Sequence, residues 1–218
     1  MSNTLRLCLN LSMLLIFLSL YGYHITGNLV HEILGTILLI LLIVHHVLNA
    51  FWYSHLHKGR LNPLRILYII VNIPLALAMS FTFVSGLMLS NVIFRYFEFP
   101  MPSEAISVHM CASAWSLILM SAHLGLNLGS MTYALGRGRL YHFLTVMMFL
   151  CGFYGIYAFL NTDLIERLFL LTGFPYFDFS KSPVFFYFDY LCIIATFTSL
   201  SSYILLRMHK RSLKNKKY

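Results

Sequence analysis

An apolar stretch that contains two histidines occurs twice in this chain. The first copy, HEILGTILLILLIVHHVLN, runs from His31 to Asn49, and the second, HMCASAWSLILMSAHLGLN, runs from His109 to Asn127. In each copy the two histidines are fourteen residues apart, and an asparagine follows four residues after the second. Fourteen helical residues bring a side chain back to within about 40° of its starting direction, about 21 Å along the axis. The repeat therefore predicts two long apolar helices, each with a histidine near either end of one face.

The composition places the chain among membrane proteins with several spans. Hydrophobic residues make up 59% of its 218 residues and charged residues only 10%, which is far from the usage of soluble domains. The net charge of +8 does not indicate a nucleic-acid partner, because the basic residues lie at the ends of apolar stretches. Lipid is therefore the expected environment.

The cysteine pattern excludes two classes of redox centre. None of the four cysteines lies in a CxxC or CxxCH arrangement, so neither a covalent c-type haem nor an iron–sulfur cluster is expected. The chain also lacks a GxGxxG stretch, which excludes a dinucleotide site of that kind.

Six apolar runs predict an all-α protein with six transmembrane helices, since about 20 residues cross a hydrocarbon core of about 30 Å. The first run has no small-residue cleavage site, so it is interpreted as an uncleaved span joined to the second by the polar link 24–28. Pro74 predicts a kink in the third span. The expected spans are residues 5–23, 29–53, 66–90, 104–127, 140–160 and 183–206.

Loop charges predict the orientation of these spans. Basic residues cluster after the second, fourth and sixth runs, so the positive-inside rule places both termini in the cytoplasm. The second and fourth spans then run in the same direction. His31 is expected to meet His109 near the outer face, and His45 to meet His123 near the inner face.

The duplication predicts the domain organisation. Two helical hairpins, residues 5–60 and 65–139, are expected to form a four-helix core within residues 1–140. Residues 141–218 add two helices, an aromatic outer loop and a basic cytoplasmic tail.

Two facing imidazoles can hold a haem iron from both sides. The four histidines therefore predict two non-covalent haems b, with His31, His45, His109 and His123 as axial ligands. The alternative is that they are hydrogen-bonded helix-contact residues, but the duplicated spacing favours ligands. His46 is a second candidate beside His45, and only His45 has a counterpart in the other copy.

Smaller features of the repeat suggest supporting roles. Gly35 and Ser113 follow the first histidine of each copy by one turn and are predicted to leave room for a macrocycle, or else to serve helix packing. Asn49 and Asn127 are candidates to bind a ligand, a haem propionate or a helix end, and interfacial polarity is an equal alternative.

Several other residues are weaker candidates. Propionate partners or topology-determining charges are alternative roles for His24, His55, His57, Lys58, Arg60, Arg137, Arg139 and His142. The segment from Leu164 to Tyr190 is predicted to form an interfacial aromatic belt, with a quinone site or a docking surface as the alternative.

The HxxxG…H…N and HxxxS…H…N copies, with the FWYSHLHKGR end, resemble a bacterial family of small membrane cytochromes b. Genes of that family often accompany flavinylated, FMN-binding extracytoplasmic proteins. The histidine pairs are also similar to those of cytochrome b in quinol–cytochrome c reductases and of ferric-reductase-type proteins. The resemblance covers about residues 5–140 and implies two haems and electron passage between the quinone pool and an extracytoplasmic flavin- or haem-containing partner. Ser113 departs from the glycine of the first copy, and the last two spans prevent a transfer of quinone-site residues.

The sequence thus predicts a di-haem cytochrome b of the bacterial cytoplasmic membrane, with a quinone as a further candidate ligand. One form of this prediction is the quinol-oxidising subunit of an oxidoreductase. A histidine-lined metal or proton transporter is an alternative, disfavoured because the spans contain almost no carboxylates. A membrane anchor subunit with one haem or none is another.

Overall fold

The computed structural model describes residues 3–56, 62–97, 99, 103–135, 138–171 and 181–214, and all of its regular elements there are helical. His57, Lys58, Arg60 and Arg137 lie outside these residues, as does 172–180 of the predicted aromatic belt. The side chains of Arg139 and His142 are not described.

The first two long helices are α1 (Asn3–Leu20) and α2 (Tyr23–Leu48). The predicted polar link 24–28 lies in the first turns of α2, where Gly27 breaks the helical backbone with φ +78°, a conformation that glycine adopts without a Cβ penalty. The second span was predicted to reach residue 53, but α2 ends at Leu48. The chain turns at Asn49 into the short α3 (Ala50–Ser54).

The third long helix, α4 (Pro63–Leu89), has a well-formed N-terminus. The side chain of Asn62 accepts a hydrogen bond from the Arg65 backbone N–H at 2.8 Å, and Pro63 occupies the first turn, where its missing N–H costs nothing. Pro74 lies inside α4 without a break in the helical backbone. A short 3-10 helix, η1 (Arg95–Phe97), follows.

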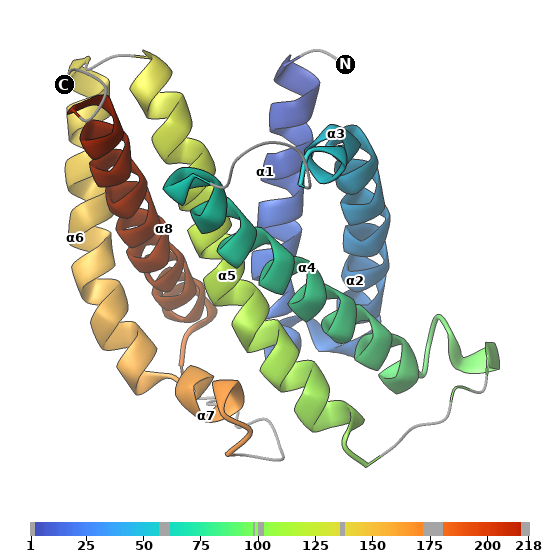
Figure 1. The fold of residues 1–218 in the computed structure, drawn as a ribbon. Helices are drawn as coiled ribbons and strands as arrows, with labels where there is room; N and C mark the ends of the chain where they lie inside the picture. Colours follow the sequence, from blue (N-terminus) through green and yellow to red (C-terminus); the bar gives the residue numbers. More distant parts are fainter. Residues whose placement is uncertain are drawn as a thin grey trace.

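The second half of the chain contains three long helices and one short one. They are α5 (Ala105–Leu135), α6 (Arg139–Asn161), α7 (Leu164–Leu168) and α8 (Pro183–Lys214). In Figure 1 the six long helices alternate in direction, so α2, α5 and α8 run one way, and the start of α1 lies at the same end as the end of α8. The predicted parallel course of the second and fourth spans is confirmed.

Helices α5, α6 and α8 pack closely together. A Cβ on Gly125 of α5 would lie 2.2 Å from the Thr198 carbonyl oxygen, and a Cβ on Gly155 of α6 would lie 2.0 Å from that of Cys192. The glycines therefore allow close approach of helix backbones, as small residues do in membranes. Helix α8, outside the repeat, thus packs along a helix of the repeat.

Within the described part of the chain, four helices are long and apolar enough to cross a membrane: Tyr23–Leu48, Pro63–Leu89, Ala105–Leu128 and Pro183–Arg211. Two shorter apolar helices cover Thr4–Leu20 and Thr145–Asn161. Large apolar side chains such as Leu15, Val47 and Phe153 are exposed. The chain is an α-helical membrane protein whose apolar surface suits contact with lipid.

Candidate functional site: two pairs of facing histidines

The parallel helices α2 and α5 bring their histidines together in two pairs. The ring centroids of His31 and His109 are 6.2 Å apart, and those of His45 and His123 are 6.4 Å apart. Both predicted pairings are therefore confirmed. The second pair lies fourteen residues beyond the first on each helix, about 21 Å further along the axis.

The separation within each pair suits a shared metal ion. Two imidazoles that bind one iron from opposite sides have ring centroids about 6 Å apart, because each metal–nitrogen bond is about 2 Å long and each centroid lies about 1 Å beyond its nitrogen. The two pairs match this spacing. The role of the four residues as haem ligands stays a prediction.

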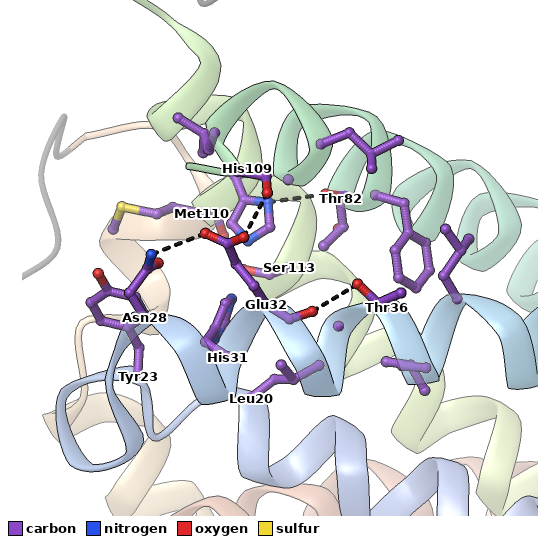
Figure 2. A pocket seen from close by; sticks show the side chains of 18 of the residues that line it. Leu20, Tyr23, Asn28, His31, Glu32, Thr36, Thr82, His109, Met110 and Ser113 are labelled. Atoms are coloured by element: carbon purple, nitrogen blue, oxygen red, sulfur yellow. Dashed lines mark hydrogen bonds between the residues drawn. The ribbon is translucent and has the colours of Figure 1, made fainter. Parts of the chain in front are cut away.

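The pair His31–His109 lies in a cavity of about 480 Å³. Ligand pockets commonly have volumes of about 300–1,000 Å³ and mostly apolar walls with a few placed polar groups. Helices α1, α2, α4, α5 and α7 each contribute to the wall. Figure 2 shows His31 on α2 and His109 on α5 pointing into the space between the helices.

The orientation of the His109 ring is fixed by α4. Its Nδ1 atom lies 3.0 Å from the carbonyl oxygen of Thr82 (Figure 2) and 3.2 Å from Oγ of Ser85. Since a carbonyl only accepts, Nδ1 carries the proton and the Nε2 lone pair is left for a ligand. A Cβ on Gly86 would lie 3.2 Å from Cε1 of this ring. These three residues were not predicted as site residues, and their signal in the sequence was a cluster of polar and small residues inside an apolar run.

The other histidine of this pair is half-buried, and the Nδ1 atom of its ring is buried. The Nδ1 atom of His31 makes no well-formed hydrogen bond to a described residue, and the Leu20 carbonyl is the polar backbone group that the ring approaches. Tyr23 packs edge-on against the ring, with centroids 5.3 Å apart. A buried polar atom without a partner costs free energy.

The small residues of the repeat line the same cavity. A Cβ on Gly35 of α2 would meet no atom within 4 Å, so this position faces open space. The hydroxyl of Ser113 on α5 donates a hydrogen bond to the Met110 carbonyl at 2.9 Å. The Ser113 carbonyl accepts one from the Tyr21 hydroxyl at 2.5 Å. The structure therefore places both residues where the sequence predicts space for a flat ligand.

Glu32 is a charged residue of the cavity wall that the sequence analysis did not single out. Its carboxylate accepts hydrogen bonds from Asn28 Nδ2 at 2.9 Å, Ser90 Oγ at 2.6 Å and the backbone N–H of Ile93 at 2.9 Å. The backbone N–H groups of the two residues between Ser90 and Ile93 donate to it as well. Glu32 thus joins α2 to the chain that follows α4. A carboxylate inside an apolar run is costly, and that was its signal in the sequence.

The second pair is surrounded by amide side chains. Nδ1 of His45 lies 3.2 Å from Oδ1 of Asn10, and Nδ1 of His123 lies 2.9 Å from Oδ1 of Asn72. Nε2 of His123 accepts a hydrogen bond from Asn127 Nδ2 at 3.0 Å. Asn10 and Asn72 were not predicted as site residues, because nothing in their spacing relates them to the repeat.

The candidates His45 and His46 have different partners. His45 faces His123, whereas Nδ1 of His46 lies 2.5 Å from the Tyr53 hydroxyl. Asn49 donates to the His45 carbonyl at 2.7 Å and so serves the end of α2. Asn127 likewise donates to the His123 carbonyl at 2.8 Å, in addition to its contact with the ring.

Two of the weaker candidates, His24 and His55, have partners other than the paired histidines. His24 packs against Phe186 with ring centroids 4.8 Å apart, and Nδ1 of His55 lies 2.8 Å from the Phe51 carbonyl oxygen. In the segment that begins at Leu164, α7 packs on α5.

No protein-family model, curated protein or solved structure matches this chain. Among the described residues, no group of three or more His, Cys, Asp or Glu side chains is arranged to hold a metal ion. A bis-histidine haem iron takes only two ligands from the protein.

Proposed function

We propose that this protein is a di-haem cytochrome b that carries electrons across the bacterial cytoplasmic membrane, between the quinone pool and an extracytoplasmic redox partner. The observation that carries the proposal is the pair of facing histidine sites on two parallel helices, with centroid separations of 6.2 Å and 6.4 Å. Two sites at different depths of one bundle give electrons a path along its axis.

The residues around the first pair fit a haem. The cavity wall is largely apolar, Gly35 leaves open space and His109 directs Nε2 away from its hydrogen-bonded Nδ1. A bound haem would supply reversible one-electron chemistry at its iron. The protein would supply two neutral imidazoles, hold them in register and exclude water from the iron.

The residues around the second pair fit a haem after one local change. Asn72 holds His123 through Nδ1, and Asn10 holds His45 in the same way, which is the usual support for a metal-binding histidine. Asn127 now donates to Nε2 of His123. Rotation of this exposed amide frees the nitrogen for iron.

The topology that we propose has six spans. The four candidate spans and the two shorter apolar helices together give six spans that alternate in direction. The basic loops favour a cytoplasmic location for both termini. The first pair, His31 and His109, then lies near the outer face, toward the extracytoplasmic partner, and is called the outer pair. The second pair, His45 and His123, is called the inner pair.

The experiment that tests the function is haem quantification. Full-length protein purified in detergent from haem-replete cells should give about two b-type haems per chain by pyridine haemochrome. His45→Ala should remove one haem, whereas the adjacent His46→Ala should retain both. Haem-free wild-type protein would overturn the proposal and favour histidine-dependent transport.

A further inference from the structure

Arg167, which lies outside the duplicated hairpins, brings a positive charge to the cavity that holds His31 and His109. We call this space the outer cavity. It lies on α7 and lines the same cavity as His31 and His109. Its side chain is only 12% exposed. A buried guanidinium beside an apolar cavity is costly unless it is paired, so what balances this charge is informative.

The position of Arg167 is fixed by packing on α5. Leu164 and Leu168, on either side of it in α7, are 0% and 7% exposed. Nε1 of Trp115 donates to the Leu168 carbonyl at 3.1 Å. Because Trp115 and His109 lie on the same helix, α5 fixes the positions of both His109 and Arg167.

Among the residues that the structure describes, the partners of Arg167 leave part of its guanidinium free for another anion. Both Nε and Nη2 donate to a single oxygen, Oδ2 of Asp163, at 2.7 Å and 2.5 Å. A guanidinium has five N–H donors, so most of them are not used by this contact. Glu32, the carboxylate of the cavity wall, already accepts hydrogen bonds from α2 and from the chain that follows α4.

We propose that Arg167 binds a carboxylate of the ligand in the outer cavity. On the proposed function, on which this inference rests, that carboxylate is a haem propionate. Arginine binds carboxylates through paired N–H donors in a fixed plane. The carboxylate edge of the ligand then lies at the α7 end of the cavity, and the helices added to the repeat take part in the outer site.

The test compares iron protoporphyrin IX with its dimethyl ester, which lacks the carboxylates. Haem-free full-length protein, in which His45 and His123 are replaced by alanine to leave only the outer pair, is titrated with each compound and followed by absorbance. We expect this chain to bind the free acid about tenfold more tightly than the ester. Arg167→Gln should remove most of that preference, and Arg167→Lys should keep part of it.

Arg95→Gln is the matched control. Arg95 lies at the same end of the molecule, is stacked over Tyr96 and does not line the cavity, so its variant should keep the full preference. Asp163→Asn should strengthen the preference, because it removes the anion that competes for Arg167.

The outcomes separate the two proposals. An unchanged preference in Arg167→Gln or in Asp163→Asn overturns the role of Arg167. If the Arg167→Gln protein binds neither compound, Arg167→Lys decides the question. A preference of Arg167→Lys for the free acid supports the role of Arg167, and equal binding of the acid and the ester by Arg167→Lys overturns it. Failure of the unmodified outer pair to bind either compound overturns the proposed function itself.

Discussion

The two histidine pairs have the same spacing in the sequence but different surroundings in the fold. The outer pair lies in a cavity of about 480 Å³, where His109 is held by groups of α4 and the buried Nδ1 of His31 lacks a well-formed hydrogen bond. The inner pair is held by the amides of Asn10, Asn72 and Asn127. Partners of metal ligands tune a haem iron, so the two sites are expected to differ in affinity and potential.

This difference shows that a sequence repeat can determine the positions of paired residues without determining the groups that surround them. The duplicated spacing sets the positions of the paired histidines on α2 and α5, while most of the supporting groups come from α1 and α4, where the two halves are not equivalent. The predictions that follow test how far the outer and inner sites are independent.

The largest effect is expected from removal of an outer ligand. His109→Ala leaves one imidazole at the outer pair, so haem content should fall from about two to about one per chain. A redox titration of the remaining haem should show a single component with the inner site's potential. Loss of both haems would show that the sites are not independent.

Filling the outer cavity should have a similar effect without touching a ligand. Gly35→Leu places a side chain in the open space beside His31, so the outer haem should be lost while the inner haem remains. The melting temperature of the haem-free protein should stay unchanged, because a Cβ at Gly35 meets no atom within 4 Å. Gly138→Ala, at another open position, is the control and should retain two haems.

A smaller effect is expected from the support of the inner ligand. Asn72→Leu removes the acceptor of the His123 Nδ1–H, which should weaken inner haem binding by about tenfold, the lower end for lost metal-ligand partners. Haem loss on dilution, followed by absorbance, measures this change. Equal weakening at both sites would contradict the assignment of Asn72 to one pair.

The smallest effect is expected at Glu32. Glu32→Gln replaces charge-assisted hydrogen bonds to the chain after α4 with weaker ones, which should cost about 1–2 kcal/mol of stability. Thermal unfolding in detergent should show a lower melting temperature, with about two haems still bound at room temperature. An unchanged melting temperature would show that the carboxylate charge does not contribute to stability.

The helical class, the parallel course of α2 and α5 and the pairing of their histidines all follow from the amino-acid sequence. Apolar runs of this length must satisfy their backbone groups within helices, and a spacing of fourteen returns a side chain to the same face. The preference for His45 over His46 also came from the repeat, and the structure places His45 opposite His123.

The surroundings of the two pairs depend instead on how the helices pack together. The contacts of Thr82 with His109, of Asn72 with His123 and of Arg167 with the outer cavity join helices that the repeat does not relate. Such contacts depend on the rotation and axial offset of each helix, which are set by packing, as at Gly125. Local sequence spacing does not encode those offsets, so the pairing of the histidines was predictable and most of their partners were not.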